Sequence, residues 1–363
     1  MRIGVDAREL AGQVTGVGRY LHGLLHEWST TGAAGEHEFV LYAPAPLPSE
    51  LSAFHTRILP ARLKPGAPRA GTWWQQTTLA SAARADHLDV FFAPQYSAPL
   101  RLSVPTVVVI YDVSFAARPE WFRTREGIRL RTLVRWSAAK ACAVVTISEF
   151  SRREIREHLR VDDRRIHVIP PGIPFRSTSA AKDSRLLYVG SIFNRRHVLD
   201  LIRAFAIVAR KHADASLDIV GDNRSYPFED VTAAIEREQL GDRLRWHRYA
   251  NDEQLADLYG RARAFAFLSE YEGLGLTPLE ALAAGAPSVL YDTAVARESC
   301  GDAALYVKPG DQRGLVHAVE TLLYDDETRG DLLMSGEPEL AKFSWSRAAS
   351  ETLRVIEQCR TSR

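Results

Sequence analysis

Residues 262–292, "ARAFAFLSEYEGLGLTPLEALAAGAPSVLYD", have the pattern of a strand, a loop, a helix and a second strand. "ARAFAFLS" is apolar apart from Arg263 and Ser269, which is typical of a buried strand. Thr277 suits a helix N-cap and Pro278 the first helical position, and the alanine-rich helix that follows ends at Gly285. "APSVLYD" is the next buried strand. A helix between two such strands predicts a βαβ unit of a parallel sheet.

The same alternation extends along the chain with one interruption. The strand-like segments before it are "RIGV", "EFVLYA", "LDVFFAP", "TVVVIYD", "AVVTIS" and "IHVIP", and those after it are "RLLYVGS", "SLDIVGD", "RLRWH", "AFAFLS", "APSVLYD" and "ALYVK". Between the two sets lies "PPGIPFRSTSAAKDS", whose Pro, Ser and Gly content indicates a linker. The sequence therefore predicts an α/β protein with two Rossmann-like, doubly wound domains, residues 1–172 and 185–344, joined by a linker at 173–184.

Composition agrees with a two-domain globular protein. The chain has 363 residues, of which 46% are hydrophobic and 25% charged. No apolar stretch approaches the roughly 20 residues that span a bilayer, and the N-terminus lacks the apolar core of a signal peptide. We therefore expect a cytoplasmic protein. Its cysteines, Cys142, Cys300 and Cys359, are odd in number and far apart, so free thiols are expected.

Charge is unevenly distributed along the chain. Residues 1–175 hold 22 basic and 16 acidic side chains, or +6, and residues 176–363 hold 24 and 29, or −5. The first half is therefore expected to meet an anionic partner. Nucleic acid is disfavoured as that partner, because no basic stretch is interleaved with stacking aromatics in the manner of a nucleic-acid platform. The segment 118–140 combines seven basic residues with Trp121, Phe122, Ile128, Leu133 and Trp136. It is either a helix with a solvated basic face or a peripheral contact with anionic lipid at the inner membrane face.

Three loops could hold phosphate, because each follows a strand and precedes a helix. Gly16 and Gly18 follow the first strand; since Leu21 replaces the third glycine of the dinucleotide motif, an NAD enzyme is disfavoured. Arg195 and Arg196 follow the first strand of the second domain, where they are either surface charge or cations for a diphosphate.

The third loop lies between Glu272 and Glu280. Gly273 and Gly275 would let a ligand approach backbone N–H groups ahead of the helix. Glu280 has two readings: it accepts hydrogen bonds from a ribose diol, or it completes a capping box with Thr277.

Together these pieces resemble the retaining glycosyltransferases of family four, which have the two-domain GT-B architecture. Glu272 and Glu280 match the E-x7-E motif of that family, embedded in "SEYEGLGLTPLEALAAGAP". Four further segments are similar to sequences of the family: "TGVGRY", "ISEFSRREI", "VIPPGI" and "KFSWSRAA". The sequences "TGVGRY" and "RPEWF" most resemble those of bacterial mannosyltransferase-like members. The resemblance implies that residues 345–363 form a helix that crosses back to the first domain.

The resemblance also implies roles for individual residues. Glu280 would bind the ribose of a nucleotide-sugar and Glu272 its hexose, while Arg195 and Arg196 would neutralise the leaving diphosphate. The remaining donor-site residues would place backbone beside the sugar and phosphates: Gly16, Val17, Gly190, Gly273, Leu274, Gly275, Leu276 and Thr277.

The chain departs from the family pattern at two positions. Tyr111, before Asp112, stands where the family commonly has a histidine, and the usual donor-site "RK" is "RR", ending at Arg196. Tyr111 and Asp112 are expected on the acceptor side, and Asp112 joins Glu272, Arg195 and Arg196 as an expected catalytic residue. No D-x-D occurs in the sequence, so we expect no metal or other cofactor.

The resemblance thus implies a retaining transferase that moves a hexose, with mannose from GDP-mannose as the first choice, to a glycan or lipid-linked acceptor in polysaccharide or glycolipid synthesis. Three alternatives stay open: a nucleotide-sugar 2-epimerase, a phosphorylase that uses orthophosphate, and a non-catalytic protein that binds a nucleotide-sugar.

Overall fold

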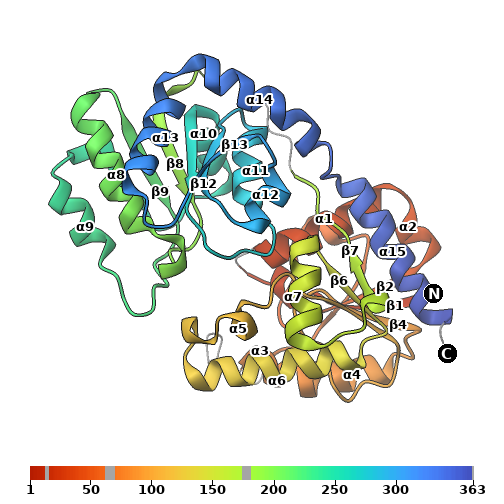
Figure 1. The fold of residues 1–363 in the computed structure, drawn as a ribbon. Helices are drawn as coiled ribbons and strands as arrows, with labels where there is room; N and C mark the ends of the chain where they lie inside the picture. The colour runs from red at the N-terminus through yellow and green to blue at the C-terminus, as the bar shows by residue number, and fades with distance from the viewer. Residues whose placement is uncertain (13–15, 62–69, 174–180, 362–363) are drawn as a thin grey trace. The chain divides into compact units, whose positions relative to one another are not determined.

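The computed structural model describes residues 1–12, 16–61, 70–173 and 181–361. It divides into two compact units (Figure 1). Unit 1 contains Met1–Gly172 and Ser344–Arg363, and unit 2 contains Ile173–Phe343. Each unit is built around one parallel sheet.

The sheet of unit 1 has seven strands in the order β3-β2-β1-β4-β5-β6-β7. The strands are β1 (Arg2–Asp6), β2 (Glu38–Ala43), β3 (His55–Ile58), β4 (Val90–Ala93), β5 (Thr106–Val109), β6 (Ala143–Thr146) and β7 (Ile166–Val168). From β1 the chain first adds β2 and β3 on one side and then continues with β4 on the other. The carboxyl ends of β1 and β4 therefore flank the point where the strand order reverses.

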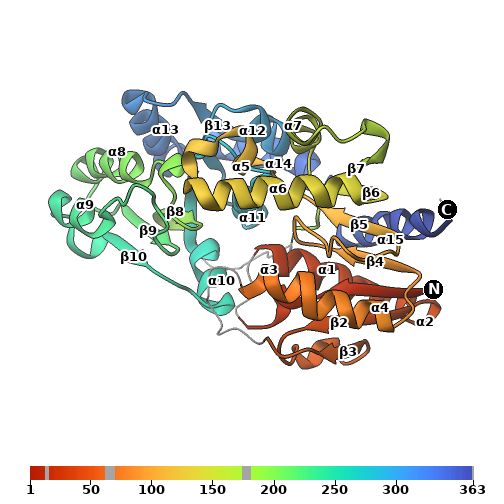
Figure 2. The same cartoon turned by 90° about the horizontal axis from the view of Figure 1, so that it is seen from below.

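Helices pack on the sheet of unit 1, as Figure 2 shows for α1, α4 and α6. The helices are α1 (Gly16–Thr30), α2 (Ala33–Glu36), α3 (Ala70–Trp74), α4 (Ala80–Ala85), α5 (Ser114–Ala117), α6 (Thr124–Lys140), α7 (Glu149–Leu159) and α15 (Trp345–Thr361). A π-helical turn, Gln75–Leu79, joins α3 to α4. The predicted opening of α1 at Gly16 is confirmed.

The sheet of unit 2 has six strands in the order β10-β9-β8-β11-β12-β13. They are β8 (Asp183–Val189), β9 (Ser216–Val220), β10 (Leu244–His247), β11 (Ala262–Phe267), β12 (Ser288–Tyr291) and β13 (Ala304–Val307). The helices are α8 (Val198–Lys211), α9 (Val231–Glu238), α10 (Asp252–Arg261), α11 (Leu276–Ala283), α12 (Ala294–Cys300), α13 (Gln312–Tyr324) and α14 (Asp326–Leu340). Here the strand order reverses between β8 and β11, so ligands are expected beyond their carboxyl ends.

The predicted α/β class with two doubly wound sheets is confirmed. Central strands such as β4, β5 and β12 are buried at every residue, which explains their continuous apolar sequences. The pattern missed β3, a short edge strand that is only half-buried. The predicted linker also extends too far, because residues 183–184 belong to β8, and residues 174–180 lie outside the described part of the chain.

The expectation of three free thiols is wrong for two of the cysteines. Cys142 and Cys359 form a disulfide, with their Cα atoms 5.8 Å apart, although 217 residues separate them in sequence. The physical reason is the return of α15 to unit 1, where it packs against α1 and the strands β4 to β6. Cys300 is free and buried.

We expect Cys359→Ser to lower the free energy of unfolding of the oxidised protein by about 2–4 kcal/mol, because the long loop closed by the disulfide is released in the unfolded chain. Denaturant unfolding with and without dithiothreitol measures this. The reductant should destabilise the parent and a Cys300→Ala control, but not Cys359→Ser. Three reactive thiols in the denatured, unreduced parent would show that the disulfide is not formed.

Among the described helices, none is both long enough and apolar enough to cross a membrane.

Candidate active site

Two loops meet at the strand reversal of unit 2. The arginine turn, residues 194–197, follows β8, and the glutamate loop, residues 269–275, follows the neighbouring strand β11. The Glu270 backbone N–H donates to the Arg195 carbonyl over 3.0 Å, which joins the loops directly. The structure therefore brings the predicted arginines and the predicted glutamate loop to one edge of one sheet.

Arg196 and Glu272 form the central contact between these loops. Arg196 Nε lies 2.8 Å from Glu272 Oε1, and the two side chains are only 13% and 17% exposed. Ser269 Oγ donates to the same carboxylate oxygen over 2.8 Å. Arg196 Nη1 donates to the Ser191 carbonyl over 2.9 Å, and its guanidinium lies over the Phe267 ring at 4.8 Å. Both charges are thus held in fixed positions.

The charges of this pair are coupled. Burial raises the pKa of Glu272, but the charge and hydrogen bond of Arg196, together with the Arg195 charge and the Ser269 hydrogen bond, outweigh burial, so the pKa falls below its usual 4.5. The folded carboxyl then loses its proton more easily than the unfolded one. The pair stabilises the fold above about pH 4.5, and this stabilisation is lost as the pH falls through the lower, folded-state pKa.

The rest of the arginine turn is also packed. The Arg195 guanidinium stacks over the Phe193 ring at 4.3 Å. Gly190, directly after β8, has φ +151°, and a Cβ there would lie 2.8 Å from Arg196 Nη1. A side chain at position 190 would therefore need both an unfavourable backbone and a displaced arginine.

Helix α11 begins earlier than the sequence predicts. Its N-cap is Gly275, with φ +89°, and no side chain caps it. The predicted Thr277 N-cap is wrong, because the left-handed Gly275 turns the chain into the helix before Thr277 is reached. Within the described structure, the buried Thr277 hydroxyl has no hydrogen-bond partner. The capping-box reading of Glu280 therefore also fails.

Glu280 instead contacts an aromatic residue of another helix. The hydroxyl of Tyr259, near the end of α10, donates to Glu280 Oε2 over 3.0 Å. Glu280 lies one turn into α11, whose opening N–H groups at 276–278 have no carbonyl of the preceding turn to bind. A carboxylate held beside a helix N-terminus can serve a diol while the N–H groups serve a phosphate.

The predicted acceptor-side residues lie in unit 1, after β5. Tyr111 is 9% exposed, and its hydroxyl donates to the Pro94 carbonyl over 2.7 Å. Burial, with smaller contributions from Tyr20 and Glu9, raises the pKa of Tyr111 well above 10. The phenol therefore stays neutral and is no substitute for a titrating histidine.

Asp112 is held from two sides. Its Oδ2 accepts from the Tyr96 hydroxyl over 2.6 Å, and its Oδ1 accepts from the Ser114 backbone N–H over 2.8 Å. Its carboxylate orientation is fixed.

Gly16 and Val17, the predicted donor residues of unit 1, start α1, and a Cβ at Gly16 would meet no described atom within 4 Å.

Two family profiles match adjacent parts of the chain and together cover most of its length. The profile described as Glycosyltransferase Family 4 matches residues 14–176, and that described as Glycosyl transferases group 1 matches residues 172–335. The chain is a glycosyltransferase.

Individual relatives agree with this assignment. The O-antigen chain mannosyltransferase B of Escherichia coli is 26% identical over 287 residues, which cover 75% of each chain. The sucrose-phosphate synthase of Thermosynechococcus elongatus has the same fold, with a TM-score of 0.81, 17% identity and full coverage of both chains. Anabaena HepE, solved with UDP-glucose, has a TM-score of 0.73 and 16% identity over 98% of this chain and 99% of its own.

Three residues at these sites were not predicted from the sequence of the glycosyltransferase. Tyr259 orients Glu280, Tyr96 orients Asp112, and His197 closes the arginine turn. Tyr96 carried a usable signal, since it lies two residues after the predicted strand "LDVFFAP". Tyr259 lies on a helix and reaches its partner only through tertiary packing.

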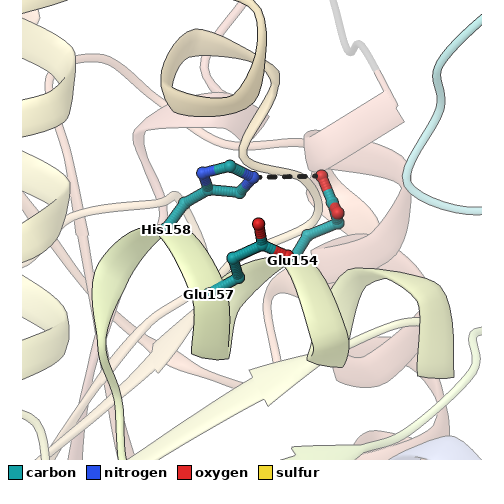
Figure 3. Close-up of side chains that lie close together, drawn as sticks. All are labelled: Glu154, Glu157 and His158. Carbon is teal, nitrogen blue, oxygen red and sulfur yellow. Dashed lines mark ion pairs between the residues drawn. The ribbon is translucent and has the colours of Figure 1, made fainter.

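A separate group of polar side chains lies on α7 (Figure 3). Glu154, Glu157 and His158 place one ligand atom each within 4.8 Å of the others, and His158 Nε2 lies 3.6 Å from Glu154 Oε2. The i,i+4 spacing and partial exposure of this pair are those of an ordinary ion pair on a helix surface. We assign it no role in transfer.

Proposed function

We propose that this glycosyltransferase moves a hexose from a nucleotide-sugar to a glycan or lipid-linked acceptor with retention at the anomeric carbon, and that GDP-mannose is its donor. The observation that carries the proposal is the meeting of the Arg195–Arg196 turn with the Glu272 loop at the β8–β11 reversal. The similarity to a mannosyltransferase favours mannose over other hexoses.

In the proposed reaction the bond between the anomeric carbon and the phosphate oxygen breaks, and the nucleoside diphosphate leaves with that electron pair. An acceptor hydroxyl attacks from the same face, and its proton passes to the leaving phosphate oxygen. Arg195 and Arg196 stabilise the growing negative charge, and the opening N–H groups of α11 add to this. Glu272 holds the hexose and Glu280 holds the ribose. Asp112 shapes the acceptor side. The positive charge comes from these arginines, so we propose that no metal is required.

A donor panel tests the choice of sugar. Calorimetric titration with GDP-mannose, UDP-glucose, UDP-galactose and UDP-N-acetylglucosamine should show the tightest binding for GDP-mannose, by about tenfold or 1.4 kcal/mol. Tighter binding of any UDP-sugar would contradict the GDP-mannose assignment while leaving the transferase activity standing.

We further propose that unit 1 contacts anionic lipid through the α3–α6 surface, defined by Trp73, Arg125, Ile128, Arg135 and Trp136. Trp73 is 59% exposed, Ile128 51% and Trp136 60%. Arg129 Nη1 donates to Thr72 Oγ1 over 2.8 Å, so α3 and α6 lie together. Exposed indole rings beside arginines are typical of a membrane interface, and a lipid-linked acceptor would be found there.

The lipid contact predicts preferential sedimentation with phosphatidylglycerol vesicles over phosphatidylcholine vesicles at low salt. Replacing Arg125 and Arg135 by glutamine should weaken binding about 30-fold, since each basic residue contributes about 1 kcal/mol. Arg210→Gln, an exposed arginine of α8, is the matched control and should bind like the parent. Equal sedimentation with both vesicle types would contradict the contact.

A further inference from the structure

His197 ends the arginine turn in an unusual conformation. Its φ is +46° and its ψ is +40°, in the left-handed region, and α8 begins at the next residue. A residue with a Cβ seldom adopts this conformation, and such outliers persist where the surrounding contacts fix them. The His197 N–H donates to the Asn194 carbonyl over 3.1 Å, and its carbonyl accepts from the Asp200 and Leu201 N–H groups. Its ring adds further contacts.

The imidazole of His197 bridges two carboxylates from different elements. Nε2 lies 2.5 Å from Glu270 Oε1 in the glutamate loop, and Nδ1 lies 3.1 Å from Asp200 Oδ2 in the first turn of α8. The Tyr291 ring, at the end of β12, packs edge-on against it at 5.1 Å. The Glu270 N–H bonds to the Arg195 carbonyl, so one hydrogen bond already joins the two loops. The contact between the His197 ring and the Glu270 carboxylate is the second contact that joins them.

Only the protonated ring can serve both carboxylates as a donor. A neutral imidazole has one N–H and one acceptor nitrogen, whereas the imidazolium has two N–H groups. Histidine is the side chain type whose unperturbed charge change falls between pH 5 and 8. The charged and titratable groups in contact with the ring are Glu270, the Tyr291 phenol and Asp200, which also pairs with Arg203, while Arg195 and Arg196 precede His197 in the same turn.

We propose that His197 is a positioning residue: as an imidazolium it holds Glu270 and the glutamate loop against the arginine turn, so that donor binding weakens when the ring loses its proton. The proposal rests on the proposed function of this site. Deprotonation has two consequences. One carboxylate contact is lost, and the Glu270 charge, two residues from Glu272, is no longer compensated and repels the donor diphosphate.

The test measures the affinity for GDP-mannose by calorimetry between pH 6.0 and 8.5. This probe is suitable because its diphosphate, esterified at both ends, does not titrate in that interval. The parent should bind about fivefold to tenfold more tightly at pH 6.0 than at pH 8.5, which is at the low end of typical coupling between sites. His197→Asn, whose side chain tolerates the left-handed backbone, should bind with one weak affinity at both pH values.

Two variants separate positioning from general effects. His212→Asn alters the histidine that directly follows the far end of α8 and also pairs with a carboxylate, Glu320, and should keep the parent's pH profile. Adding Glu270→Gln to His197→Asn removes the uncompensated charge and should recover part of the lost affinity. An equal pH response in the parent and in His197→Asn, or no response in the parent, would overturn the role of His197 and leave the proposed function intact. A parent that binds no nucleotide-sugar of the panel would overturn the proposed function and this inference with it.

Discussion

Arg196→Ala is expected to lower kcat/KM for hexose transfer by about 100- to 1,000-fold, the usual loss when one fixed donor to developing charge is removed. It is also expected to lower the free energy of unfolding by about 3–5 kcal/mol, because Glu272 keeps its buried charge without the cation that pairs with it. Steady-state kinetics and denaturant unfolding measure the two effects separately.

Companion variants show which effect dominates. Replacing Arg196 by Met together with Glu272 by Leu removes both charges, so stability should return while transfer stays absent. Arg210→Ala removes an ion-paired but exposed arginine of the same unit and should change neither quantity appreciably. If folded Arg196→Ala transfers hexose within threefold of the parent, the arginine does not stabilise the leaving diphosphate.

Glu280→Ala is expected to weaken binding of free nucleoside diphosphate by about 10- to 150-fold, because hydrogen bonds from the ribose to a carboxylate contribute roughly 1.5–3 kcal/mol. Glu272→Ala should differ. Arg196 loses its competing carboxylate, so affinity for free diphosphate should be kept or increased, while transfer falls because the hexose is no longer held. Calorimetric titration of both folded variants measures this contrast.

The Tyr259→Phe variant is the control for Glu280. It removes the phenol that orients the carboxylate but leaves the carboxylate itself, so its loss in affinity should be smaller than that of Glu280→Ala. Parent-like binding by Glu280→Ala would show that the ribose assignment is wrong.

How far the fold could be predicted from the sequence depends on how deeply each strand is buried. Strands buried on both faces have unbroken apolar sequences, so β4, β5 and β12 were visible in the pattern. The edge strand β3, "HTRI", is half-exposed and carries no such signal. The start of α11 was misplaced because capping preferences favour Thr277, whereas the backbone of Gly275 decides where the helix begins.

The candidate site was predictable where it depends on position after a strand. Arg195, Arg196 and Glu272 follow β8 and β11, and parallel pairing of these strands brings them together. Contacts between distant segments were not predictable. Neither the bond from Tyr259 to Glu280, nor the bridge made by His197, nor the disulfide between Cys142 and Cys359 has a local sequence signature.

The most direct test of the account measures release of GDP from GDP-mannose in excess EDTA, with and without a mannose-terminated glycan acceptor. We predict that release requires the acceptor, that the acceptor gains one hexose with retained configuration, and that EDTA does not reduce the rate. Release without any acceptor, conversion to a different sugar nucleotide, or a complete loss of transfer that Mg²⁺ restores would contradict the proposed metal-independent transfer.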